Sequence, residues 1–284
     1  MLSRATVEAH SQQAARMGAI GMTCPICSGS MRPVFSAQVL SKLRADYEVC
    51  NTCGFLRAHE PHWLDEAYTT AIAAADTGLV MRNISIASKL SAILYWGLSE
   101  RGNGTYVDAA GGYGMLTRLM RDFGFNFYWK DKYCENLIAP GFEYHDKLGP
   151  CIAVTAMEVM EHLIDPVAFV QETLADANAQ TLIFTTELYE GEPPKPNAWW
   201  YYAFETGQHI GFYQRKTLQT LGKKLGLHFS SAGGIHMLSK ATISEHRLRL
   251  LTHRAVSPIA PWWIRRKLGS KTFTDHKSML TRIV

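Results

Sequence analysis

The stretch that decides the fold is Thr105-Tyr106-Val107-Asp108-Ala109-Ala110-Gly111-Gly112-Tyr113-Gly114-Met115-Leu116-Thr117-Arg118-Leu119-Met120. A short apolar segment runs into a turn of small residues, and apolar residues then recur at helical spacing. Glycines occupy such a turn where the backbone must approach a ligand closely. The stretch therefore predicts a strand, a ligand-binding turn and a helix, the unit of an α/β fold with a doubly wound, mostly parallel sheet.

An acidic residue at the expected end of the next strand adds to this prediction. Residues 125–129 form an aromatic, apolar run that leads to Asp131, 23 residues after Asp108. A carboxylate there is placed to bind both hydroxyls of a ribose. The small residues Ala110, Gly112 and Gly114 occupy every second position of the turn. The carboxylate of Asp108, which precedes them, would repel a pyrophosphate but would attract an ammonium group. We therefore expect a nucleoside-containing cofactor with a cationic group.

These residues resemble the first motif of class I S-adenosylmethionine-dependent methyltransferases, D-x-G-x-G-x-G, with Ala110 in place of the first glycine. Residues 153–166 resemble the fourth-strand segment of that family, and residues 181–187 resemble its fifth strand. The resemblance implies a Rossmann-like core with a seven-stranded sheet, S-adenosylmethionine as cofactor, and an adenine near residues 142–144. The cofactor-binding residues that it implies are Asp108, Ala110, Gly111, Gly112, Gly114, Asp131, Met157 and Glu158.

Four of the six cysteines form two C-x2-C pairs, separated by 22 residues: Cys24, Cys27, Cys50 and Cys53. Two such turns can aim four thiolates at one Zn²⁺, and a site with four protein ligands is structural. We expect a small zinc ribbon with strands at 34–40 and 46–49. We expect Cys134 and Cys151 to be small buried residues that bind no metal.

An N-terminal four-cysteine module followed by this core is similar to bacterial sugar methyltransferases that act on nucleotide-activated sugars or surface polysaccharides. The expected domains are a zinc module at 1–62, a helical cap or linker at 63–104, the methyltransferase core at 105–245 and a basic tail at 246–284.

A proline-rich and aromatic segment, residues 191–213, follows the expected fifth strand. A loop that leaves the carboxyl end of a strand overhangs the ligand crevice of a doubly wound sheet. Its aromatic faces suit a sugar ring and would equally suit a flipped nucleobase. The predicted substrate-binding residues are Trp199, Trp200, Tyr201, Tyr202 and Tyr213.

Methyl transfer to a hydroxyl needs a group that accepts the hydroxyl proton. His209 is the expected general base, and the alternative is a histidine that only bonds to backbone within a packed loop. Glu205 could orient His209 or replace it. His162 is the competing base, although the resemblance implies a structural or cofactor-edge role for it. Glu158 could instead be a carboxylate that stabilises a helix start.

The net charge of +4 is uneven, because the chain from Lys240 onward carries ten basic and two acidic residues. Residues 261–268 place two tryptophans beside three cations. We expect this tail to pack on the core. The alternatives are contact with anionic lipid, with a phosphorylated acceptor or with nucleic acid.

No apolar run of about 18 residues and no secretory signal is evident, so we expect a cytoplasmic protein with reduced thiols, which leaves peripheral membrane association through the tail open. The expected function is methyl transfer from S-adenosylmethionine to a sugar hydroxyl on a glycan or nucleotide sugar. The alternatives are a zinc-ribbon RNA nucleobase methyltransferase, a sugar C-methyltransferase and a non-catalytic binding module.

Overall fold

The structure, a computed structural model, describes residues 23–68 and 76–283 of the 284-residue chain. The parts of the expected zinc module and helical linker that fall at 1–22 and 69–75 lie outside the described residues. The chain divides into two compact units, which are described separately. Unit 1 comprises residues 1–73, 158–171 and 185–229, and unit 2 comprises 74–157, 172–184 and 230–284. Both units are discontinuous in sequence, and the linear domain boundaries stay a prediction.

The strands are β1 (Met31–Val39), β2 (Leu43–Cys50), β3 (Leu56–Ala58), β4 (Thr105–Ala109), β5 (Asn126–Lys130), β6 (Cys151–Ala156), β7 (Thr181–Phe184), β8 (Gly211–Phe212), β9 (His228–Ala232) and β10 (Ile235–Ser239). The α-helices are α2 (Leu64–Ala67), α3 (Leu79–Ala92), α4 (Met115–Asp122), α5 (Pro166–Asp176), α6 (Arg215–Leu225), α7 (Glu245–Leu251), α8 (Ala260–Leu268) and α9 (Thr272–Ile283). The other helical turns are η1 (Ile93–Gly97), η2 (Asp146–Leu148), η3 (Met160–His162), η4 (Pro196–Ala198) and η5 (Trp200–Tyr202).

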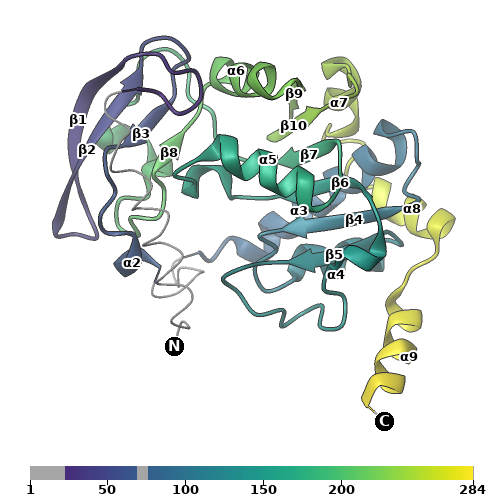
Figure 1. Ribbon diagram of the computed structural model, residues 1–284. Coiled ribbons are helices and arrows are strands. Elements are labelled where there is room, and N and C mark those ends of the chain that lie inside the picture. The colour runs from purple at the N-terminus through teal and green to yellow at the C-terminus, as the bar shows by residue number, and fades with distance from the viewer. Residues whose placement is uncertain (1–22, 69–75, 284) are drawn as a thin grey trace. The chain divides into compact units, whose positions relative to one another are not determined.

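Unit 1 contains a four-stranded antiparallel sheet in the order β1-β2-β3-β8 (Figure 1). The β1–β2 hairpin matches the two strands expected between the cysteine pairs. β8 pairs with β3 in the register Leu56↔Phe212. The segment that follows β7 therefore completes the sheet that the cysteine-containing segment begins.

The larger sheet has six strands in the order β5-β4-β6-β7-β10-β9. β4, β5, β6 and β7 pair in parallel, and β10 runs antiparallel to β7. This is the Rossmann-like, mostly parallel α/β architecture expected from the glycine turn.

The prediction of seven strands is wrong for the residues that the structure describes, which form a sheet of six strands. Residues 142–144, which follow the expected third strand, make only an isolated bridge to β5, with Trp129 N–H donating to Phe142 O at 2.8 Å and Tyr144 N–H donating to Trp129 O at 2.7 Å. Pro140, Gly141 and Gly149 bracket a stretch whose His145, Asp146 and Lys147 are exposed. A segment with so little apolar material and with breakers at both ends does not extend the bridge into a strand.

The basic tail packs on the core of unit 2. Ala260 and Ile264 of α8 are buried in the same hydrophobic cluster as α3 and β4. Trp263 packs against Trp96, with ring centroids 5.4 Å apart, whereas Trp262 is 57% exposed. Within the described ranges no helix is long and apolar enough to cross a membrane.

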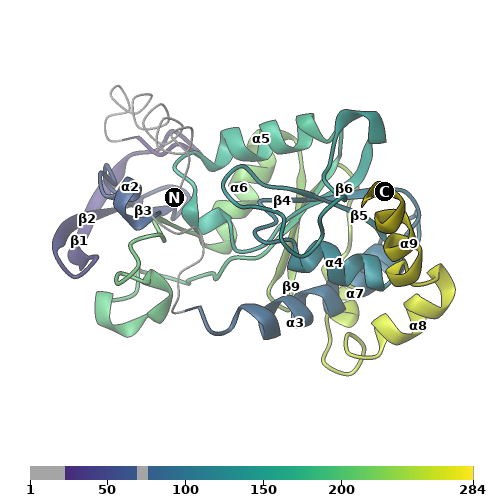
Figure 2. The same cartoon turned by 90° about the horizontal axis from the view of Figure 1, so that it is seen from below.

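The first turn of α9 is fixed to the end of α4 by a buried ion pair, and Figure 2 labels both helices. Arg121 donates to both oxygens of Asp275, from Nη2 to Oδ1 at 2.7 Å and from Nε to Oδ2 at 2.8 Å. Arg118 adds a bond from Nη2 to Oδ2 at 2.8 Å. Burial raises the pKa of Asp275, but the hydrogen bonds from Arg121 and Arg118 lower it by a larger amount. The pKa of Asp275 therefore lies below its ordinary value.

We expect Asp275→Asn to lower the free energy of unfolding by about 3 kcal/mol, because it leaves a buried guanidinium without its counter-charge. The pKa of Asp275 is depressed in the folded state, so its contribution is complete above the unfolded pKa and is lost as the pH falls through the folded pKa. Urea unfolding of both proteins between pH 7 and pH 3 should therefore show a stability difference that shrinks with acidification. A difference that does not change with pH would contradict the ion-pair interpretation.

Candidate functional site

The turn between β4 and α4 has the backbone that a close ligand approach requires. Gly112 and Gly114 have φ of 55° and 89°, in the left-handed region. A Cβ on Gly114 would lie 2.5 Å from Asn136 Oδ1 and 3.2 Å from the Ala139 nitrogen. Ala110 has φ of 60°, so the alanine that replaces the first glycine of the motif adopts the conformation that glycine favours.

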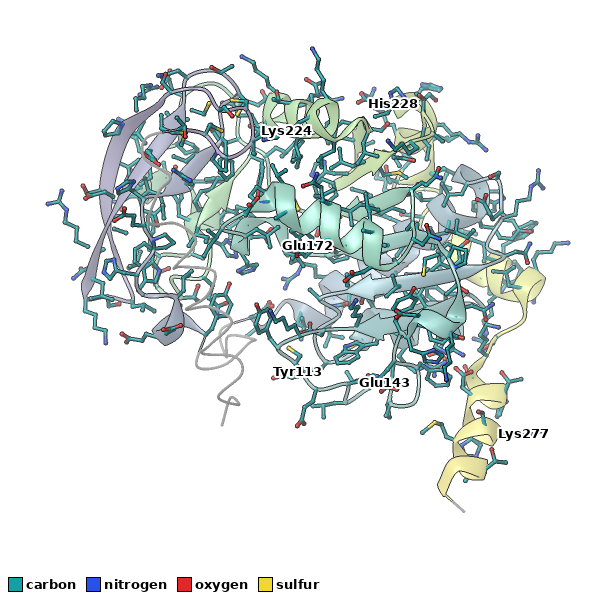
Figure 3. The ribbon with its side chains drawn as sticks, viewed as in Figure 1. Tyr113, Glu143, Glu172, Lys224, His228 and Lys277 are labelled. Atoms are coloured by element: carbon teal, nitrogen blue, oxygen red, sulfur yellow. The ribbon has the colours of Figure 1, made fainter. Side chains whose placement is uncertain are left out.

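Asp131 connects the turn to the loop that follows β5. Its Oδ2 accepts from Gly112 N–H at 2.9 Å, and its Oδ1 accepts from Tyr133 N–H at 2.7 Å and Cys134 N–H at 2.9 Å. A carboxylate offers about four acceptor positions, so one remains for a ribose hydroxyl. Figure 3 labels Tyr113, on this turn, and Glu143, which accepts from Asn136 Nδ2 at 2.8 Å. These bonds preorganise the turn before a ligand binds.

Asp108 lies at the carboxyl half of β4 and is buried. Burial raises its pKa to about 7, against a bond from Thr155 Oγ1 at 2.7 Å that lowers it, and the charge of Asp131 raises it further. A cation beside this carboxyl would restore its charge. Met157, which follows β6, is half-buried against the same core.

We expect Asp131→Ala to weaken S-adenosylmethionine binding at least tenfold, because it removes both the ribose acceptor and the clamp on the Gly112 amide. Isothermal titration with S-adenosylhomocysteine measures this. Asp146→Ala, which removes an exposed carboxylate of unit 2, is the matched control and should leave the affinity unchanged. Equal affinities in the two variants would contradict the ribose assignment.

A second group of polar side chains gathers in unit 1, where η3 brings Glu161 and His162 next to His209. One carboxylate oxygen of Glu161 and one ring nitrogen of each histidine lie within 4.8 Å of one another. The two imidazole rings are perpendicular, with centroids 4.9 Å apart. The structure thus brings together the two histidines that the sequence offered as competing bases.

Backbone bonds hold the two chain segments of this cluster in register. Ile210 N–H donates to Glu161 O at 2.8 Å, and the buried Tyr213 hydroxyl donates to Met160 O at 2.7 Å. On its other side, Ile210 O accepts from Ala58 N–H of β3 at 2.8 Å. His209 is therefore attached to the four-stranded sheet, although it belongs to a long irregular loop.

The hydrogen bonds define the tautomer of each histidine. His162 Nδ1 lies 3.0 Å from Gln208 O and 2.9 Å from the Tyr68 hydroxyl. His209 Nδ1 lies 2.6 Å from Tyr201 O. Carbonyl oxygens only accept, so each Nδ1 carries the hydrogen and each Nε2 keeps its lone pair in the neutral ring. Burial and the neighbouring His209 lower the pKa of His162 to about 3, so His162 is neutral.

Glu161 is fully buried, and neither of its carboxylate oxygens has a hydrogen bond of normal geometry from any residue the structure describes. Burial raises its pKa, and the facing His209 charge and the neighbouring Tyr201 and Thr186 hydroxyls oppose that rise. An unpaired buried carboxylate costs several kcal/mol in general, and such groups are uncommon in folded proteins. The group is therefore a candidate ligand-binding side chain.

The other predicted catalytic and substrate-binding residues are placed differently. Glu205 is exposed and makes no described contact with His209. Glu158 accepts from Thr185 Oγ1 at 2.6 Å. Trp200 is 78% exposed, and Trp199 is half-buried.

Three predicted substrate-binding tyrosines are buried. Tyr202 and Tyr213 are almost fully buried in the core, so their side chains have no exposed surface with which to contact an acceptor. Tyr201 is buried between Trp200 and His209, with centroid distances of 5.4 and 4.7 Å. Of the five predicted substrate-binding residues, Trp199 and Trp200 are therefore the two whose side chains have substantial exposed surface.

Sequence reasoning missed Glu161 and Tyr68 as members of the site. The signal for Glu161 was present, because an acid directly before His162 interrupts the apolar run that follows β6. The contact between the Tyr68 hydroxyl and His162 Nδ1 joins positions 94 residues apart, and no local sequence pattern predicts such a contact.

The four clustered cysteines also converge. Cys24 Sγ lies 3.6 Å from Cys53 Sγ, and Cys27 Sγ lies 3.4 Å from Cys50 Sγ. The four sulfurs lie within 4.8 Å of one another and form no disulfide. Thr52 and Cys53 N–H groups both donate to Cys50 Sγ at 3.4 Å. Lys224, labelled in Figure 3, donates to Pro25 O at 3.1 Å and ties α6 to the first knuckle.

Residues 83–231 match the model of a family described as a methyltransferase domain, which spans just over half of the chain. The chain belongs to this family and carries an S-adenosylmethionine-dependent methyltransferase domain. No curated protein sequence matches it significantly.

A search of solved structures found matches of low similarity, among them the following three. TnmH is 18% identical at a TM-score of 0.43, with 62% of this chain and 60% of TnmH covered. Mitomycin 7-O-methyltransferase MmcR is 16% identical at 0.38, with 55% and 53% covered. Magnesium protoporphyrin IX methyltransferase from Synechocystis PCC 6803, with bound S-adenosylmethionine, is 13% identical at 0.37, with 63% and 90% covered. The chain thus spans less than two thirds of the first two proteins, and the family match remains the evidence for the class.

Proposed function

We propose that the protein transfers the methyl group of S-adenosylmethionine to a hydroxyl group of a sugar, carried by a nucleotide or a glycan. One observation carries the acceptor assignment. The loop that supplies His209 also presents an exposed indole, Trp200, which packs edge-on against Tyr201 beside that histidine. An exposed aromatic face suits the C–H face of a sugar ring, and the polar groups next to it suit the hydroxyls.

The residues of unit 2 fit the proposed cofactor. The left-handed glycine turn lets backbone approach it, Asp131 keeps one acceptor position for a ribose hydroxyl, and Asp108 can gain its charge beside a cation. When bound, S-adenosylmethionine supplies an electrophilic methyl group on a sulfonium. His209, with Nδ1–H donated to Tyr201 O, offers Nε2 to accept the proton of the acceptor hydroxyl.

The test is a mass-spectrometric screen for methylated sugar nucleotides and glycans, using S-adenosylmethionine with a labelled methyl group. We expect an increment of one methyl group on oxygen in an acceptor. His209→Ala should lower turnover by about 10²–10⁴-fold, because it removes the proton acceptor, and should leave cofactor affinity nearly unchanged. His246→Gln, which changes an exposed histidine, should leave turnover unchanged.

Three outcomes would contradict this function. Methylation of RNA without methylation of any sugar would favour the zinc-ribbon RNA alternative. A methyl group on carbon would favour the C-methyltransferase alternative. Near-normal turnover of His209→Ala would reject His209 as a participant in the proton transfer.

We also propose that the four clustered cysteines hold a structural zinc ion. Tetrahedral zinc with Zn–S distances of about 2.3 Å places its sulfurs about 3.8 Å apart. The observed pairs at 3.4 and 3.6 Å fit such a site and are far too long for disulfides. The N–H groups that donate to Cys50 Sγ favour a thiolate at that position.

We expect purified protein to contain about one zinc ion at these cysteines, and Cys50→Ser to lose it together with several kcal/mol of stability, because metal binding contributes to folding. Elemental analysis and thermal unfolding measure the two effects. Cys134→Ser removes a cysteine outside the cluster and should retain the zinc. Zinc loss of equal size in both variants would contradict the assignment.

A further inference from the structure

We propose that Glu161, His162 and His209 bind a second metal ion, a divalent transition-metal ion held by one carboxylate and two imidazoles. The three potential ligand atoms lie within 4.8 Å of one another. The three residues belong to unit 1, as the four clustered cysteines do, but the two clusters share no residue. The site is therefore separate in composition from the proposed zinc ribbon.

The donor set identifies the class of ion. Two imidazoles and one carboxylate are borderline donors that suit Zn²⁺, Fe²⁺ and Co²⁺, whereas Mg²⁺ and Ca²⁺ prefer oxygen ligands alone. Three protein ligands leave at least one coordination position for water or an oxygen of the acceptor. A three-ligand site of this kind is typical of catalytic rather than structural metals.

The hydrogen bonds around the histidines are those of metal ligands. A ligating histidine usually donates its other ring N–H to a carbonyl or carboxylate, which fixes the ring and the tautomer. His162 donates Nδ1–H to Gln208 O, and His209 donates Nδ1–H to Tyr201 O. Both Nε2 lone pairs remain, and neither has a hydrogen-bond partner within the described part of the chain.

Glu161 supplies the independent observation that points to a ligand. Its carboxylate is fully buried and lacks a hydrogen bond of normal geometry from the described residues. The backbone carbonyl of the same residue is paired, because Glu161 O accepts from Ile210 N–H. A buried carboxylate that lacks a hydrogen bond of normal geometry, on a residue whose backbone carbonyl is held in place, is explained when a cation binds to it.

The scaffold also limits how far the ligands can move apart. Gln208, between the two ligand segments, donates Nε2–H to Ala67 O at 2.8 Å, and Tyr213 is bonded to Met160 O. Trp63 Nε1–H donates to Gly207 O at 2.8 Å just before His209. Metal ligands on a rigid frame need little reorganisation when the ion enters.

The consequence for the reaction rests on the proposed function. An acceptor hydroxyl bound to the ion would have a lowered pKa and would release its proton to solvent. Its oxygen would then form a bond to the methyl carbon as the S–CH3 bond of S-adenosylmethionine breaks, with S-adenosylhomocysteine as the leaving group. His209 would then act as a metal ligand, and its loss would reduce turnover by removing the ion rather than a free base. No change in metal oxidation state is needed.

The test uses the full chain with zinc already bound at the cysteines, and Co²⁺ as the probe. Equilibrium dialysis and visible absorption should show one Co²⁺ per chain with nitrogen and oxygen ligands and without thiolate charge-transfer bands. Glu161→Gln and His209→Gln should each weaken Co²⁺ binding at least about 100-fold, because each removes a ligand. His246→Gln, an exposed histidine, should bind Co²⁺ as the unmodified chain does.

Several results would overturn the site: no Co²⁺ beyond the cysteine zinc, thiolate bands alone, or unchanged affinity in Glu161→Gln and His209→Gln. Thermal unfolding without Co²⁺ checks folding, and Glu161→Gln should be at least as stable as the unmodified chain, because it removes a buried charge. His209→Gln, at a half-buried position, keeps the test valid if Glu161→Gln does not fold.

Methyl transfer is a separate readout. Co²⁺ binding without methylation of any sugar would reject the proposed function and retain the metal site. Methylation that persists unchanged after the second ion is removed, with zinc retained, would overturn the role of the ion in the reaction.

Discussion

The candidate catalytic cluster depends on the backbone of one residue, Ile210. Its N–H donates to Glu161 O in η3, and its carbonyl accepts from Ala58 N–H in β3. These two bonds connect three segments that are far apart in the sequence, and all three belong to unit 1. Buried backbone groups must be paired, so the position of His209, next to Ile210, is fixed by a requirement that has nothing to do with catalysis. Backbone pairing with the sheet thus fixes the position of the side chain that the candidate site uses.

This arrangement also explains why the four-cysteine segment and the aromatic segment form one compact unit. β3 lies between β2 and β8, and the cysteines are at the ends of the strands and turns that precede it. Thr217 Oγ1 of α6 donates to Cys53 O at 2.7 Å, and the Tyr189 hydroxyl donates to Gly54 O. A metal that orders the cysteine turns would therefore stabilise the loop that carries His209. The proposed zinc ion acts on the site through folding rather than through contact with an acceptor.

Local patterns predicted the parts of the fold that local physics decides. The strand, glycine turn and helix at 105–122 and the hairpin between the cysteine pairs follow from apolar spacing and turn residues. The absent seventh strand could not be predicted from a family resemblance, because pairing failed where exposed residues and glycines replace apolar ones. Likewise, composition identified the aromatics at 199–213 but not their burial. Which of two adjacent rings faces solvent depends on contacts with β8 in the same segment and with β2, which is distant in sequence.

The difference between what local sequence patterns predict and what long-range contacts decide also applies to the two histidines. Sequence reasoning treated His162 and His209 as competitors for one role, since a single general base is enough for hydroxyl methylation. The structure places their rings 4.9 Å apart, with each Nδ1 bonded to a backbone carbonyl. Two imidazoles with the same hydrogen-bonding role, beside one carboxylate that lacks a hydrogen bond of normal geometry from the described residues, are redundant as bases, because one proton needs one acceptor. They are not redundant as ligands, because a metal ion uses every lone pair in its shell. Coordination of one ion therefore accounts for the pairing of the two histidines, a feature that neither residue displays alone.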